Sequence, residues 1–150
     1  MDHATLRSYR LGDWQAMHAL DLLCFEPVFR FSRGAMRSFA EATGALTVLA
    51  EAHGKLAGFC IAQLQDGAGY VVTLDVAPAW RRRGLARRLM ADAESRLHSA
   101  GAAEMHLHVF TGNTAAILFY ESIGYSQMCV AENFYAQNLH ALVYRKQLPA

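Results

Sequence analysis

The sequence predicts an α/β fold with a mixed, mostly antiparallel sheet of about six to seven strands flanked by about four helices. Short apolar segments typical of strands interleave along the chain with segments whose apolar residues recur at helical spacing. A hairpin signal, His53-Gly54-Lys55, joins two of the strand-like segments, because glycine supplies the positive φ that tight turns need. The length of 150 residues fits a single domain over residues 1–150.

The first half of the chain is expected to begin with a strand, where polar and apolar residues alternate. Asp13 and Ser32 are suitable N-caps for two helices, and Pro27 interrupts an aromatic loop between them. The expected elements are strands at residues 5–10, 46–52 and 56–64, a helix at residues 14–25, and a second helix that begins after Ser32 and ends near Gly44.

The second half continues this interleaved pattern after a turn at residues 66–69. Gly101 and Gly124 follow helical segments and are typical helix stops. Asn133, Phe134 and Tyr135 are expected in a loop between the last two strands. The expected elements are strands at residues 70–76, 104–110, 125–130 and 139–146, and helices from the arginine run to about residue 100 and at residues 115–123.

Composition indicates a soluble globular protein, with 53% hydrophobic and 18% charged residues. The net charge of +1 gives no general attraction to nucleic acid or to an acidic membrane. No apolar run approaches the ~20 residues of a membrane span, and the first ten residues lack a signal-peptide core. We therefore expect a cytoplasmic protein, with no membrane or nucleic-acid partner, as a monomer or homodimer. The three cysteines form no C-x-x-C pair and are expected to be free, buried thiols.

Five of the eight residues from Arg81 to Arg88 are arginine, and they follow an apolar strand and a proline. A helix is expected to start just after them. Its first turn would present unpaired N–H groups and the positive end of the helix dipole to one point. Such a turn suits a pyrophosphate, whereas the alternative is a solvated basic helix start.

Two motifs resemble those of the GNAT N-acetyltransferases. Arg81-x-x-Gly84-x-Ala86 fits the family loop Q/R-x-x-G-x-G/A, and the run from Asn113 through Tyr120 to Tyr125 is similar to N-x-x-A-I-x-x-Y-x-x-x-G-F. Both occur in the family order with a strand between them. Within the family, the His108 strand and the Asn133-Phe134-Tyr135 segment are most similar to N-terminal protein acetyltransferases of the RimI and NatE type.

The resemblance implies acetyl-CoA as co-substrate. It implies main-chain contacts to the pantetheine arm at Leu74, Asp75 and Val76, although the Asp75 side chain is expected in solvent or against an arginine. Asn113, an expected N-cap, and Tyr120 would also contact the cofactor. The pyrophosphate would lie against the loop residues Arg81, Arg82, Arg83, Gly84, Leu85, Ala86 and Arg87.

Acetyl transfer to an amine needs a neutral nucleophile and a proton donor for the leaving thiolate. A free α-amine has a pKa of about 7.7–8.0, against about 10.4 for lysine, so more of it is already neutral near pH 7 and a weaker base is sufficient. A histidine with a pKa near ~6.5 is adequate for this task. His108 is the candidate base, with Tyr70 as its partner by resemblance to NatE, and Tyr120 is the candidate acid. RimI-like enzymes have a glutamate where this chain has His108.

Other residues carry weaker signals. The loop aromatics Phe29, Phe31 and Tyr135 are candidate substrate-binding residues, with core packing as the alternative for the first two. His106 and His108 share a strand face, but two ligands fall short of a metal site, so no metal is expected.

The sequence thus predicts an acetyl-CoA-dependent N-acetyltransferase acting on the N-terminal α-amine of a protein or peptide, with ribosomal proteins as one candidate class. Two alternatives stay open: an acetyltransferase for small amines, and a non-catalytic acyl-CoA-binding module. Nucleic-acid binding through the arginine run is disfavoured by the net charge of +1.

Overall fold

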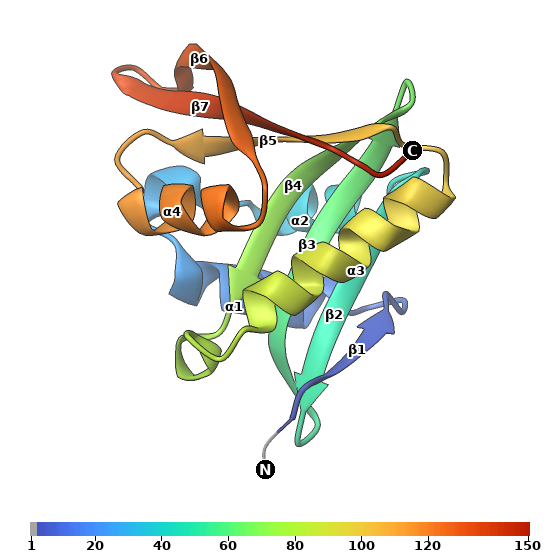
Figure 1. Ribbon diagram of the computed structural model, residues 1–150. Coiled ribbons are helices and arrows are strands. Elements are labelled where there is room, and N and C mark those ends of the chain that lie inside the picture. The colour runs from blue at the N-terminus through green and yellow to red at the C-terminus, as the bar shows by residue number, and fades with distance from the viewer. Residues whose placement is uncertain (1–2) are drawn as a thin grey trace.

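The computed structural model describes residues 3–150, and within them the strands form one seven-stranded sheet of order β1-β2-β3-β4-β5-β7-β6 (Figure 1). Neighbouring strands are antiparallel except for the parallel pair β4 and β5. The strands are β1 (Thr5–Ser8), β2 (Ala45–Ala52), β3 (Lys55–Gln65), β4 (Ala68–Val76), β5 (Glu104–Phe110), β6 (Ser126–Ala136) and β7 (Leu139–Gln147). The helices are α1 (Trp14–Cys24), α2 (Arg33–Ala40), α3 (Leu85–Ser99) and α4 (Thr114–Ser122), with short 3₁₀ turns η1 (Pro27–Phe29) and η2 (Pro78–Trp80). The predicted α/β class, mixed sheet and helices are confirmed.

The helices cover both faces of the sheet. In Figure 1, α3 and α4 lie in front of it, and α1 and α2 lie behind. Leu85, Leu89, Ala93 and Leu97 recur every four residues along α3 and are buried in the front core. Met17, Met36 and Phe59 belong to the rear core. No helix in residues 3–150 combines the length and apolar character that a membrane crossing requires.

Two tight turns set the register of the central strands. His53 and Gly54 have φ values of 55° and 72°, and Asp66 and Gly67 have 51° and 78°. Consecutive positive φ angles give the turn whose twist matches that of antiparallel strands. The second turn is tighter than predicted, so β4 begins at Ala68 rather than at residue 70.

The predicted loop between the last two strands is wrong. Asn133, Phe134 and Tyr135 belong to β6, which continues to Ala136 through a register shift. Asn133 adopts a φ of 56°, and its side chain accepts a hydrogen bond from the Asn138 amide at 2.7 Å. The His140 ring also accepts from the Asn133 amide, which lets the irregular strand continue.

Two local predictions need correction. Asp13 does not cap α1, because its carboxylate accepts from the Arg10 amide and pairs with Arg7 at 2.7 Å. Ser32 does cap α2, accepting from the Ala35 amide at 3.1 Å. The cysteines are free as predicted, but Cys129 is exposed because β6 is an edge strand.

Candidate functional site

The parallel strands β4 and β5 pair along only part of their length. Residues 68–71 of β4 pair with residues 104–107 of β5. Beyond them β4 continues beside β3 to Val76, and β5 continues beside β7 to Phe110. Val72 has no partner in β3, so a bulge bends β4 where the two strands part. Figure 1 shows the resulting wedge opening toward the side on which α4 lies.

The parting of the strands leaves one edge of β4 without a strand partner in the described residues. The Ala77 amide bonds to Ala57 of β3 at 2.8 Å. Because main-chain groups alternate in direction along a strand, the Leu74 and Val76 amides face the wedge, and the Asp75 amide faces β3. The Val76 carbonyl agrees with this direction, since it accepts from Cys24 Sγ and Arg81 Nε, each at 3.4 Å.

The arginine-rich turn lies between the end of β4 and the start of α3. Arg82 and Gly84 adopt φ values of 63° and 77°. Leu85 is buried in the core, so it fixes the start of the helix. The first N–H groups of a helix have no intrahelical acceptor, and here the N-cap residue, Gly84, has no side chain to cap them. Together with the exposed arginines from Arg81 to Arg83, they form a site suited to an anion.

Asn113 stands at the start of α4 and caps it, as predicted. Its side-chain oxygen accepts from the Ala116 amide at 3.1 Å. Asn113 is itself exposed, whereas the last turn of α4 carries the buried Tyr120. This helix therefore starts at the surface and ends in the front core.

Tyr70 and His108 meet at the point where β4 and β5 separate. The Tyr70 hydroxyl is 2.9 Å from His108 Nδ1. The Phe134 ring stacks on the imidazole, with centroids 3.9 Å apart and planes 6° apart. Tyr70 and His108 were predicted as partners from the sequence, but the stacking of Phe134 was not.

Burial favours the neutral forms of the His108 imidazole and the Tyr70 hydroxyl. The pKa of His108 is lowered below its ordinary value, first by burial and then by the neighbouring His106. Burial raises the pKa of the Tyr70 hydroxyl. At neutral pH, an uncharged imidazole therefore faces a protonated phenol, which is the state that a general base requires.

Tyr120 lies in the front core and is only 9% exposed. Its pKa is raised well above its ordinary value, first by burial and then by Cys60, Asp75 and Tyr135. Tyr120 therefore stays protonated, so its hydroxyl can donate but gives up its proton reluctantly.

The loop aromatics separate into two groups. Phe29 packs against Phe110 and Tyr135, with centroids 5.0 Å from each ring. Phe31 instead contacts Phe39, 5.5 Å away, and joins the rear core. The packing alternative thus describes Phe31, whereas Phe29 and Tyr135 lie in a cluster with Phe110, which the sequence did not single out.

The expectation for the Asp75 side chain is wrong. It is fully buried and accepts from the Thr73 hydroxyl at 2.6 Å. Burial and contact with Asp21 raise its pKa well above the ordinary value. The bulge at Val72 explains the error, because it turns Asp75 toward α1 rather than toward solvent or the arginines.

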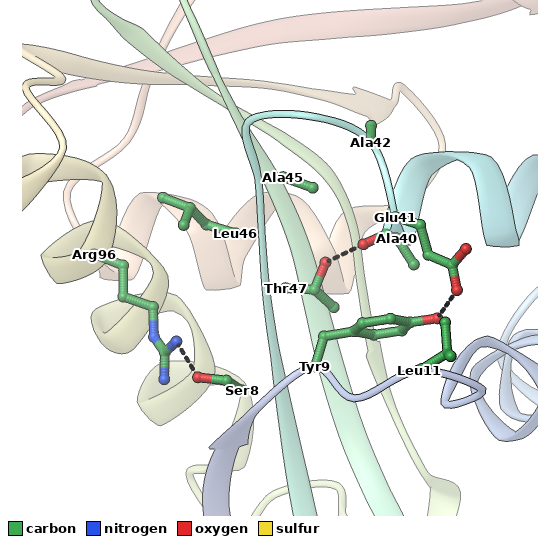
Figure 2. Close-up of a pocket in the computed structure, with 10 residues that line it drawn as sticks. All are labelled: Ser8, Tyr9, Leu11, Ala40, Glu41, Ala42, Ala45, Leu46, Thr47 and Arg96. Atoms are coloured by element: carbon green, nitrogen blue, oxygen red, sulfur yellow. Dashed lines mark hydrogen bonds between the residues drawn. The ribbon is translucent and has the colours of Figure 1, made fainter.

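An open hollow of about 530 Å³ lies elsewhere, between β1, α2, β2 and α3. Its wall includes Tyr9, which donates to Glu41, and Arg96, which donates to Ser8 (Figure 2). No predicted site residue lines this hollow. Over residues 3–150, no group of three or more His, Cys, Asp or Glu side chains is arranged to hold a metal ion.

This chain is similar in sequence to two acetyltransferases of known name. The [ribosomal protein bS18]-alanine N-acetyltransferase of Escherichia coli K12 is 34% identical over 83 residues, which are 55% of this chain and 56% of that protein. The match thus spans about half the length of that relative. NAA10 of Arabidopsis thaliana, the catalytic subunit of the N-terminal acetyltransferase A complex, is 28% identical over 149 residues, covering 95% of this chain and 77% of that protein.

The structure of the Escherichia coli ribosomal-protein-S18-alanine N-acetyltransferase superposes with a TM-score of 0.89. The alignment covers 99% of this chain and 96% of that one at 24% identity, which shows a shared fold. The acetyltransferase (GNAT) family model matches residues 14–125, most of the chain and both predicted motifs. The chain therefore belongs to the GNAT acetyltransferase family.

Proposed function

We propose that this protein transfers the acetyl group of acetyl-CoA to the N-terminal α-amine of a protein or peptide. The observation that carries the proposal is the Tyr70–His108 contact of 2.9 Å at the point where β4 and β5 part. Relatives named as N-terminal acetyltransferases support the acceptor class, with a ribosomal protein as one candidate.

Acetyl-CoA fits the wedge by its chemistry. The pantetheine arm carries amide groups that can pair with the unpaired edge of β4 at Leu74 and Val76, as an added strand would. The pyrophosphate would lie on the N–H groups at the start of α3, with Arg82, Arg83 and Arg87 screening its charge. The thioester would then lie inside the wedge, beyond the arginines.

In the proposed reaction, the amine nitrogen attacks the thioester carbonyl, and the carbon–sulfur bond breaks. The amine proton passes to the Tyr70 oxygen while the Tyr70 proton moves to His108 Nδ1. The Tyr120 hydroxyl donates a hydrogen bond to the departing sulfur. A thiol has an ordinary pKa of about 8.5, below that of Tyr120, so hydrogen bonding stabilises the thiolate better than full proton transfer does.

The acceptor class is tested with peptides that differ in their first residue, compared with free amino acids and polyamines. We expect kcat/KM for the best peptide to exceed that of any small amine by about tenfold or more, because only a peptide can also contact the walls of the wedge. Peptides blocked at the N-terminus but carrying an internal lysine are the control and should not react. Acetylation of small amines alone would contradict the proposal.

The cofactor turn is tested with Gly84→Ala, and Gly67→Ala is a matched control. Both glycines have φ near +77°, and a Cβ at either position meets no atom within 4 Å. Each substitution should therefore cost a similar stability, about 1–2 kcal/mol, through backbone strain alone. Only Gly84→Ala should raise KM for acetyl-CoA, by about tenfold. Equal KM values in the two variants would show that this turn does not hold the cofactor.

The base is tested by the pH dependence of kcat at saturating acceptor. Since the pKa of His108 is lowered, kcat should stay level near neutral pH and fall only in acid, below the ordinary histidine pKa of about 6.5. His108→Ala should remove this limb and lower kcat by about 100-fold or more. His106→Ala, the control on the same strand, should keep kcat within about threefold. A full rate in His108→Ala would mean that a group other than His108 is the base.

A further inference from the structure

Two carboxyl groups lie buried together between α1 and β4. Asp21 and Asp75 are both 0% exposed, and Asp21 lies close enough to Asp75 to raise its pKa. Asp21 Oδ2 accepts from the Phe31 amide at 2.9 Å, and Asp75 Oδ1 accepts from Thr73. Each group keeps one buried oxygen without another donor, namely Asp21 Oδ1 and Asp75 Oδ2.

The surroundings do not neutralise two negative charges. A negative charge on Asp75 contributes to raising the pKa of Cys24 in α1, of Cys60 in β3 and of Tyr120 in α4. Arg81 lies beside Cys24 and the Val76 carbonyl. Within the described residues, the groups that shift the pKa of Asp75 are Asp21 and Thr73, neither of which is a cation. Two ionised carboxylates in contact would therefore be costly.

A single proton between the two carboxyl groups would satisfy the unpaired oxygens and would also remove one of the two negative charges. Placed between Asp75 Oδ2 and Asp21 Oδ1, it gives each orphaned oxygen a partner and lowers the charge of the pair from two to one. The protonated carboxyl then donates across the contact, while Asp21 Oδ2 still accepts from Phe31.

We propose that Asp21 and Asp75 share a proton near neutral pH, and that this hydrogen bond positions the segment after α1 against the cofactor edge of β4. The positioning role rests on the proposed acetyl transfer, whereas the shared proton does not. Neither residue touches the reacting atoms, so both are positioning residues.

The contacts of the pair connect the two halves of the site. Asp21 holds the Phe31 amide, at the end of a segment whose η1 turn places Phe29 against Phe110 and Tyr135. Asp75 lies in β4 between Leu74 and Val76, whose amides face the wedge. The shared proton would thus join the acceptor side to the cofactor side across the protein interior.

A raised pKa in the folded state fixes the sign of the pH effect. The stability contributed by protonated Asp75 is complete below the unfolded pKa, about 3.9, and is lost as the pH rises through the raised folded pKa. Asp75→Asn keeps the shape, accepts from Thr73 and donates to Asp21, but does not titrate. Asp66→Asn, at an exposed turn position, is the matched control.

Thermal unfolding from about pH 5 to about pH 9 tests the shared proton without any need for activity. The Tm of Asp75→Asn minus that of the wild type should grow steadily as the pH rises, and Asp66→Asn should follow the wild type. A Tm difference that is constant with pH would overturn the proposal, as would failure of Asp75→Asn to fold.

Acceptor kinetics test the positioning role. Asp75→Asn should keep the wild-type KM for the acceptor at low pH, and the ratio of the wild-type KM to the Asp75→Asn KM should rise with pH. Asp75→Ala, which removes the donor, should raise acceptor KM by about tenfold, a larger effect than its effect on kcat. If Asp75→Ala does not fold, the ratio of the wild-type KM to the Asp75→Asn KM is the test. A ratio that is constant with pH would contradict the positioning role. Absence of acetyl transfer to any acceptor would refute the proposed function. The Tm series would still test whether Asp21 and Asp75 share a proton.

Discussion

The separation of β4 from β5 is the constraint on which the rest of the site depends. Paired strands satisfy their main-chain groups with one another, so they leave nothing for a ligand to bind. The bulge at Val72 ends that pairing after four residues and exposes a short edge at the centre of the sheet. An exposed edge is usually a liability in a protein. Here it lies between covering helices and opens beside the arginine-rich turn that precedes α3.

Charged side chains lie at the rim of the wedge, and neutral ones lie deeper inside it. Arginines from Arg81 to Arg83 are exposed at the rim, where a pyrophosphate would stay partly hydrated. Deeper in, burial favours the neutral forms of Tyr70 and His108. A neutral interior would suit the uncharged thioester and the neutral amine of the proposed reaction, because burial of an ammonium ion is costly.

The sequence predicted what depends on local chemistry. Ser32 and Asn113 are caps because their side chains reach amides three residues ahead. The Tyr70–His108 pair, in contrast, was expected from the resemblance to NatE-type enzymes. The length of β6, the burial of Asp75 and the contact of Phe110 with Phe29 could not be predicted, because each depends on register or on segments far apart in the chain. A bulge is a one-residue event with no strong local signature, yet it decides which way Asp75 points.

Amide hydrogen exchange along β4, with and without acetyl-CoA, tests most directly whether this edge holds the cofactor. The Leu74 and Val76 amides face the wedge, whereas those of Asp75 and Ala77 face β3 and are internal controls. We expect fast exchange at Leu74 and Val76 in the free protein and strong protection once acetyl-CoA binds, with slow exchange at Asp75 and Ala77 in both states. Equal protection of all four amides in the free protein, or no change at Leu74 and Val76 on binding, would contradict it.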